Sequence, residues 1–186
     1  MWSQIIPINV LREDAELKKS IPRKYGVYKW WCSKKTFIIL IDQLKNYSVS
    51  CINANTVLRY VEKCIINGAE YYCFYVGEST ALYKRIIKWH LGNDMSKSTL
   101  RRAINSLKNG KLRCDEEYVN SIVNDCYIQW IELSDKESMS SLEKKEINSY
   151  IRVLNIKDSV MRDNCEEEKY REVIVTALKK ARSSIE

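Results

Sequence analysis

Two ionisable side chains in the sequence lie at positions where their charge needs a partner. Glu143 precedes Ile147 and Leu154 on the inward face of a predicted helix, and a buried carboxylate is costly unless it meets a cation or a metal ion. Arg85 lies beside an apolar helical stripe near the end of a predicted strand, so its guanidinium requires an anionic partner. The carboxylate is a hard oxygen ligand that suits Mg²⁺ or Mn²⁺, with water and phosphate completing the shell. The alternative is a first-turn Glu143 that is favoured by the helix dipole or forms a salt bridge with Arg85.

Arg85 belongs to residues 71–90, where a β-rich apolar run passes into a basic helical pattern. Aromatic residues up to Tyr75 favour a strand, Gly77 permits a turn or the close approach of another segment, and Ser79 can cap a helix. The helix is expected to bury a stripe at helical spacing, formed by Leu82, Ile86 and Trp89.

These residues form part of an ordered set of motifs that resembles the GIY-YIG nuclease signature. Gly26-Val27-Tyr28 resembles its first half, and Tyr75-Val76-Gly77 resembles its second half. The remaining elements follow in family order as Leu82-x-x-Arg85, His90, Glu143 with Ile147, and Asn155. The resemblance spans residues 26–155 and leaves an N-terminal helix and a C-terminal tail outside it.

The resemblance implies a metal-dependent endonuclease that hydrolyses DNA phosphodiester bonds with one divalent cation, Mg²⁺ or Mn²⁺. In that family the glutamate matching Glu143 holds the metal on the scissile phosphate, and the arginine matching Arg85 neutralises developing charge. The motif tyrosines, Tyr28 and Tyr75 here, position or activate water. A metal ion and a guanidinium suit this chemistry because preorganised positive charge acts where phosphoryl charge builds.

A tyrosine needs assistance to act as a base, because a phenol has a reference pKa of about 10. A nearby cation can lower that pKa, and Lys84, Lys88 or His90 could be this neighbour. Without the motif, the twelve tyrosines are more typical of core residues with satisfied hydroxyls, and His90 of a capping cation or a packed ring. Three further residues are expected to shape the site: Gly26, Gly77 and Asn155.

The chain departs from the family pattern at positions that bear on activity. Glu78 follows the second motif glycine, where many relatives carry Lys or another small or polar residue, so a basic partner for the water is missing. The histidine of many relatives falls four residues after the arginine, a position that Trp89 holds here, with His90 one residue later. The proline usual shortly before Asn155 is absent. A catalytically inactive nucleic-acid-binding module of the same fold is therefore the alternative, and RNA is a third option for the ligand.

The sequence carries 31 Lys and Arg against 24 Asp and Glu, and the formal net charge of +7 favours a polyanionic partner. The excess is concentrated in residues 84–113, where nine Lys and Arg accompany a single acid, Asp94. No strongly basic amphipathic helix with an extended aromatic face is present, so nucleic acid is favoured over a membrane surface. The expected DNA contacts are Lys84, Lys88, Lys97, Arg101 and Arg102. Among these, Lys97 and Arg102 are assigned to phosphates, and base reading is left open for Arg101.

The pattern of expected helices and strands predicts one domain over residues 1–186. Its class is α/β (α+β), with a small three-stranded mixed sheet flanked by helices. Five Gly and two Pro leave no obvious linker. Strands are expected at 25–31, before Gly77 and at 126–133, and helices at 9–20, around Arg85, and at 96–107, 115–123, 138–152 and 166–182. Residues 34–45 fit a helix or a strand. Asn67-Gly68 favours a hairpin turn between 61–66 and the strand that leads to Tyr75.

The seven cysteines are odd in number and never form Cys-x-x-Cys, which argues against a disulfide scaffold and a zinc ribbon. No apolar run reaches membrane-spanning length and the N-terminus lacks a signal core, so we expect a cytoplasmic protein. Excision-repair and homing relatives usually add large partner or DNA-binding domains, for which this chain has no room. We therefore expect a restriction-like enzyme that acts on double-stranded DNA, as a homodimer if the target is palindromic.

Overall fold

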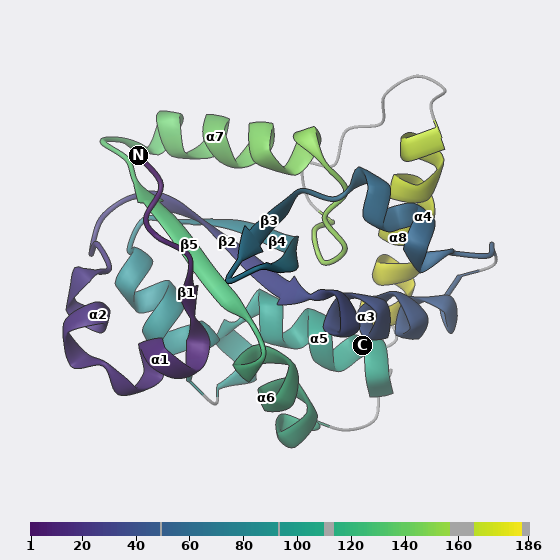
Figure 1. The fold of residues 1–186 in the computed structure, drawn as a ribbon, viewed down its shortest axis with the longest axis horizontal. Coiled ribbons are helices and arrows are strands. Elements are labelled where there is room, and N and C mark those ends of the chain that lie inside the picture. The colour runs from purple at the N-terminus through teal and green to yellow at the C-terminus, as the bar shows by residue number, and fades with distance from the viewer. Residues whose placement is uncertain (49, 93, 110–113, 157–165, 184–186) are drawn as a thin grey trace.

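The computed structural model describes residues 1–48, 50–92, 94–109, 114–156 and 166–183. At its centre lies a five-stranded sheet in the order β1-β5-β2-β4-β3, with antiparallel neighbours throughout (Figure 1). The strands are β1 Ile6–Pro7, β2 Gly26–Ser33, β3 Lys63–Ile66, β4 Ala69–Ser79 and β5 Tyr127–Glu132. The mixed helix and strand class and the three central strands are as predicted. The expected three-stranded mixed sheet is wrong, because β1 and β3 extend it at both edges and the described pairs are all antiparallel.

The central strand β2 is buried along almost its whole length because structure covers both faces of the sheet. Its alternate residues face opposite sides, so Tyr28 and Trp30 belong to the main core, whereas Val27 and Trp31 belong to a smaller one. The smaller core is covered by α7 (Lys136–Ser149), and α3 (Lys34–Lys45) lies against the other face (Figure 1). The sheet thus separates two packed layers, and its motif residues can reach either of them.

The remaining helices are α1 Ile8–Glu13, α2 Ala15–Ser20, α4 Ala54–Val57, α5 Thr99–Asn109, α6 Glu116–Asn124 and α8 Glu166–Ser183. Two 3-10 turns, Leu58–Tyr60 and Met95–Lys97, and a π-helix, η2 Lys84–His90, complete the described elements. The single helix expected over residues 9–20 is wrong, because Asp14 separates two short helices. The Asp14 carboxylate accepts the N–H groups of Glu16 and Leu17 and so caps α2.

Local side-chain chemistry accounts for two stretches of the chain. Residues 34–45, which fitted a helix or a strand, form α3, and the Ser33 hydroxyl caps it by accepting the N–H of Thr36. The hairpin predicted at Asn67-Gly68 is confirmed, because it joins β3 to β4. Asn67 has φ 50° and Gly68 has φ 79°, the left-handed pair that a two-residue type I′ turn requires.

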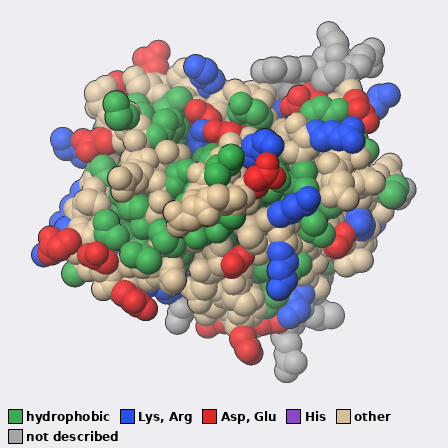
Figure 2. Space-filling view, in the orientation of Figure 1, with side chains coloured by type: hydrophobic (Ala, Val, Ile, Leu, Met, Phe, Trp, Pro, Cys, Tyr) green, Lys and Arg blue, Asp and Glu red, His purple; other side chains and the backbone are tan. Residues whose placement is uncertain are grey.

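The helices, cysteines and surface charges of the described residues can be compared with what the sequence predicts about partners. None of the helices in these ranges is long and apolar enough to cross a bilayer. The six cysteines among these residues are free thiols. On the face seen in Figure 2, basic and acidic side chains are interspersed, so the net positive charge forms no single patch there. Contacts with DNA therefore have to be sought residue by residue around the cavity described next.

Candidate active site

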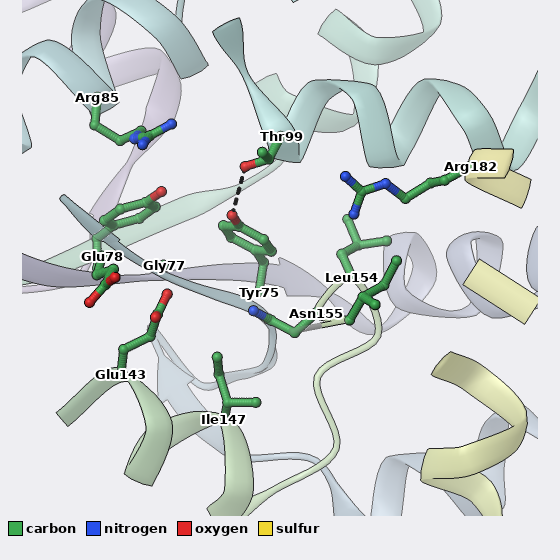
Figure 3. A pocket seen from close by; sticks show the side chains of 12 residues that line it. Tyr75, Gly77, Glu78, Arg85, Thr99, Glu143, Ile147, Leu154, Asn155 and Arg182 are labelled. Carbon is green, nitrogen blue, oxygen red and sulfur yellow. Dashed lines mark hydrogen bonds between the residues drawn. The ribbon is translucent and has the colours of Figure 1, made fainter. Parts of the chain in front are cut away.

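A cavity of about 500 Å³ opens between β4, α7 and the last turn of α8 (Figure 3). Its wall contains four of the five predicted catalytic residues, which come from four different elements: Tyr28, Tyr75, Arg85 and Glu143. The rest of the wall consists of Gly77, Glu78, Thr99, Ile147, Leu154, Asn155, Ile156 and Arg182. The fold thus brings motif residues from distant parts of the sequence to one place.

The two motif glycines lie where other groups approach closely. Gly77 is opposite Tyr28 in the register of β2 and β4, and a Cβ atom on Gly77 would collide with the Tyr28 hydroxyl. A Cβ atom on Gly26 would collide with the carbonyl oxygen of Ile131 and the side chain of Leu82. Gly77 therefore continues β4 instead of forming a turn, and its lack of a side chain makes room for the phenol.

Behind Tyr28 lies the single histidine of the chain. The Tyr28 hydroxyl is 2.8 Å from Nε2 of His90, and Nδ1 of His90 is 2.7 Å from the Ser98 hydroxyl. Burial, and then the charges of Arg85 and Arg101, hold the pKa of His90 well below its usual range. Burial also raises the pKa of Tyr28 well above 10. The pair is therefore a neutral phenol hydrogen-bonded to a neutral imidazole at pH 7.

The π-helix η2 explains how His90 reaches Tyr28 from a position one residue beyond the usual family spacing. The N–H of Leu91 donates to the carbonyl oxygen of Ile86, five residues back, at 2.9 Å. This wide turn carries His90 into the core and leaves Trp89 only half-buried. The expectation that Trp89 belongs to the buried stripe is therefore wrong.

Trp89 supports Arg85 instead. The guanidinium carbon of Arg85 is 4.3 Å from the centre of the Trp89 ring, a cation–π contact. The Nε atom of Arg85 is buried without a hydrogen-bond partner among the described residues. Arg85 and Glu143 line the same cavity. A partly desolvated guanidinium that lines a cavity in this way is suited to bind an anion there.

Two carboxylates enter the cavity below Arg85 in the view of Figure 3. Glu143 on α7 has 9% of its surface exposed. Glu78 on β4 accepts a hydrogen bond of 2.9 Å from the Ser140 hydroxyl, which holds its carboxylate beside α7. Across the described ranges, no three His, Cys, Asp or Glu side chains form a ligand cluster. The site thus offers a metal ion one or two carboxylates next to open space.

The other side of the cavity holds residues outside the motifs. The Tyr75 hydroxyl is 3.0 Å from Oγ1 of Thr99 at the start of α5, and burial raises the pKa of Tyr75. Arg182, in the last turn of α8, extends toward Thr99 and Tyr75 (Figure 3). Sequence reasoning misses Arg182, because basic residues at the end of a helix are explained by the helix dipole alone.

Asn155 shapes the cavity through the backbone of β4. Its side-chain Oδ1 accepts the N–H of Val76 at 2.9 Å, and its Nδ2 donates to the carbonyl oxygen of Val76 at 2.8 Å. The N–H of Leu154 also donates to the carbonyl oxygen of Phe74 at 3.1 Å. The segment after α7 is therefore held along β4 as a strand would be, although the family proline is missing.

Four of the five expected DNA contacts are exposed. Lys84 and Lys88 lie on the outer side of η2, and Arg102 lies on the outer side of α5. Lys97 is exposed as well, with its ammonium group 3.2 Å from the Asp94 carboxylate. Their contact with DNA stays a prediction, but each side chain can be reached from solvent.

Arg101 is fully buried, so its predicted place on the basic surface is wrong. Its guanidinium donates to the carbonyl oxygen of His90 at 3.4 Å and to Oδ1 of Asn120 at 2.9 Å. Asn120 belongs to α6, which packs against this side of α5. Arg101 thus holds the end of η2 in place and has no free edge with which to read a base.

Comparison with protein families accounts for the arrangement of this site. A model described as the GIY-YIG catalytic domain matches residues 26–182, and so includes the whole cavity and α8 up to Arg182. The match extends beyond Asn155, where the sequence motifs end. Neither the curated proteins nor the solved structures contain a match to the chain. Because the family match covers well over half of the 186 residues, the chain belongs to the GIY-YIG nuclease family.

Proposed function

We propose that this protein is a metal-dependent endonuclease that cuts double-stranded DNA by phosphodiester hydrolysis, as a restriction-like enzyme. Membership of the family supports nuclease chemistry. The observation that supports this site is that the Arg85 guanidinium and the Glu143 carboxylate line one cavity, with Nε of Arg85 buried and without a hydrogen-bond partner among the described residues. A phosphate in that cavity would meet a cation on one side and a carboxylate suited to hold a metal ion on the other.

The donor set fits Mg²⁺ or Mn²⁺. Both prefer oxygen ligands, and Mg²⁺ usually keeps several waters, so one or two carboxylates with a substrate phosphate suffice. Glu143, with Glu78 near it, provides such oxygens beside a cavity of about 500 Å³. When bound, the metal ion would polarise the phosphate and favour deprotonation of water.

Tyr28 is the residue that we assign to accept a proton from the attacking water. Its hydroxyl is 2.8 Å from Nε2 of His90, within reach for passing its own proton to that nitrogen as it takes one from water. Arg85 assists, since its charge lowers the pKa of Tyr28 against the larger effect of burial. Lys84 and Lys88 lie on the outer side of η2 and His90 is neutral, so Arg85 is the cation that lowers the pKa of Tyr28, while His90 is its hydrogen-bond partner.

Arg85 is assigned to the phosphate charge that grows during hydrolysis. Its stacking on Trp89 fixes the guanidinium before substrate arrives, so little reorganisation is needed when the charge develops. Tyr75, held by Thr99 on the other side of the cavity, is assigned to the positioning of water or phosphate.

The second candidate function is a catalytically inactive DNA-binding module of the same fold. The observation in its favour is Glu78, whose carboxylate lies in the cavity and adds a negative charge where phosphate would bind. The displaced histidine no longer favours this alternative, since the π-helix brings His90 to Tyr28.

A cleavage assay separates the two functions. Plasmid DNA, a pool of linear duplexes and a matched RNA are each incubated with the protein in Mg²⁺, Mn²⁺ or EDTA, and new ends are mapped by sequencing. We expect metal-dependent cutting of DNA by the parent protein and none by Glu143→Gln, which keeps the shape of the side chain without its charge. Binding of DNA without cutting in either metal would favour the inactive module, and cutting of RNA alone would change the substrate class. If the mapped site is palindromic, sedimentation with and without that duplex measures whether two copies bind.

A further inference from the structure

Arg182 ends a helix that lies outside the motifs, yet its side chain forms part of the cavity wall. Helix α8 packs against α5, the helix that begins at Thr99 of the cavity wall. In Figure 3, Arg182 extends toward Thr99 on the other side of Tyr75 from Glu143. The cavity therefore has a second cationic wall, distinct from that of Arg85.

This second wall has no anionic partner within the part of the chain that the structure describes. Earlier in α8, Arg171 forms ion pairs with Glu167 and Glu168, whereas no ion pair between described residues includes Arg182. Arg182 is partly buried, and burial, followed by the charge of Arg102, lowers its pKa. A guanidinium that is partly withdrawn from water without an ion pair is costly unless an anion joins it.

An anion-binding role explains the position of the Arg182 side chain better than a role in stabilising the C-terminus of α8. Cations are favoured in the last turn of a helix, but Lys179 and Lys180 already provide positive charge near that end. The Arg182 side chain instead lines the cavity, and the dipole of α8 does not explain that position. Its position is therefore better explained by a ligand.

We propose that Arg182 holds a phosphate of the cut strand next to the scissile one, so that α8 forms a second phosphate subsite. The identity of this ligand rests on the proposed nuclease function. Arginine suits the task because its fork of N–H donors matches phosphate oxygens. One strand would then pass Arg85 at the scissile phosphate, cross Tyr75, and meet Arg182 at the neighbouring phosphate.

The first test measures binding, so it does not depend on cleavage. Anisotropy of a fluorescein-labelled duplex in EDTA, at several salt concentrations, compares the parent with Arg182→Ala, Arg182→Gln and the matched control Lys179→Ala on the same helix. We expect both Arg182 variants to bind several-fold more weakly and to lower the salt slope by about one unit, while Lys179→Ala changes neither. Unaltered melting temperatures of the two Arg182 variants exclude unfolding as the cause of weaker binding. The Gln variant is the stricter control, because it keeps more of the aliphatic part of the arginine side chain than Ala does. Parental affinity in both Arg182 variants, or an equal loss in Lys179→Ala, would overturn the subsite.

The second test places the contact along the strand. Duplexes that carry one uncharged methylphosphonate linkage beside the mapped cut are compared with unmodified ones. The modification should raise KM several-fold for the parent but not further for Arg182→Ala, because that contact is already lost. An equal increase in both proteins would overturn the assignment. If the parent protein cuts no DNA, the proposed function is refuted, but the binding comparison can still be made. If the parent cuts DNA and the Arg182 variants bind it as tightly as the parent does, only the subsite is refuted.

Discussion

The Tyr28 hydroxyl lies 2.8 Å from Nε2 of His90, although 62 positions separate the two residues in the chain. The contact depends on the π-helix η2, whose wide turn directs His90 into the core. An α-helix has 3.6 residues per turn and would direct Trp89, four residues after Arg85, toward that side instead. One widened turn therefore restores the histidine of the motif and frees Trp89 to stack on Arg85.

The buried, neutral state of His90 predicts a pH dependence of stability. The pKa of His90 is lowered in the folded protein, whereas an unfolded histidine takes up its proton near pH 6.5. The unfolded chain then binds more protons below that pH, so the stability that is present above about pH 6.5 is lost as pH falls through and below it. Thermal melts between about pH 7.5 and 5 should show this loss in the parent and a flatter profile in His90→Gln. Because the chain has a single His, parallel profiles in the two proteins would contradict the buried neutral imidazole.

The two motif tyrosines should respond differently to removal of their hydroxyls. Tyr28→Phe leaves Nε2 of the buried His90 without its partner, so we expect a loss of about 1 kcal/mol in the free energy of unfolding and slower cutting. Tyr75→Phe removes a bond to the partly exposed Thr99 and should slow cutting with a smaller loss of stability. Urea unfolding and single-turnover cleavage measure the two effects separately. A Phe variant that cuts at the parental rate would show that its hydroxyl only packs the core.

The facing pair Gly77 and Tyr28 predicts a specific rescue. Gly77→Ala should destabilise the fold by roughly 1–3 kcal/mol, because the new methyl group collides with the Tyr28 hydroxyl. Adding Tyr28→Phe removes the colliding oxygen but keeps the ring carbon Cζ, 2.6 Å from the new Cβ, so it should recover only part of that loss. A double-mutant cycle of urea unfolding curves measures the coupling. Simple additivity would mean that the backbone of β4 moves to relieve the collision.

Features of the fold and the site could be predicted from the sequence where the local backbone requires a particular residue type. Gly77 is needed for close approach, and Asn67-Gly68 for two left-handed residues, so both could be predicted from residue type alone. The order of the motifs then predicted that Tyr28, Arg85 and Glu143 share a site. The first two predictions depend on a few neighbouring residues, whereas the shared site rests on the resemblance to the family, whose motifs span residues 26–155.

The remaining features depend on contacts that no single sequence displays. Helical spacing shows which residues share a face of α5, but not that α6 covers Arg101. The spacing also assumes an α-helix, so it places Trp89 inside where the π-helix places His90. The strand β1 has two residues, too few for any alternation to be seen. Arg182 belongs to the site only because α8 packs against α5.

Substitution of Glu143 should separate binding from cutting. Glu143→Ala removes the carboxylate assigned to the metal ion, so we expect no cleavage in Mg²⁺ or Mn²⁺. Its affinity for duplex DNA in EDTA should be unchanged or higher, because one negative charge near the phosphate is gone. Cleavage and anisotropy measurements on the same preparations test this directly. Cutting at the parental rate would remove Glu143 from the site.

The contrast between Arg101 and Lys88 predicts opposite effects for two cations of the same basic segment. Arg101→Ala should lower the free energy of unfolding by roughly 1.5–3 kcal/mol, because the buried carbonyl oxygen of His90 and the side chain of Asn120 lose a charged donor. Lys88→Ala removes an exposed charge, so stability should be nearly unchanged, while DNA affinity falls and the salt slope decreases by about one unit. Urea unfolding and anisotropy at several salt concentrations, both at a temperature where each variant is folded, measure the two quantities for each protein. If Arg101→Ala kept parental stability and lost DNA affinity, its guanidinium would belong to the DNA-facing surface, and the packing of α6 against α5 would have to differ from the one described.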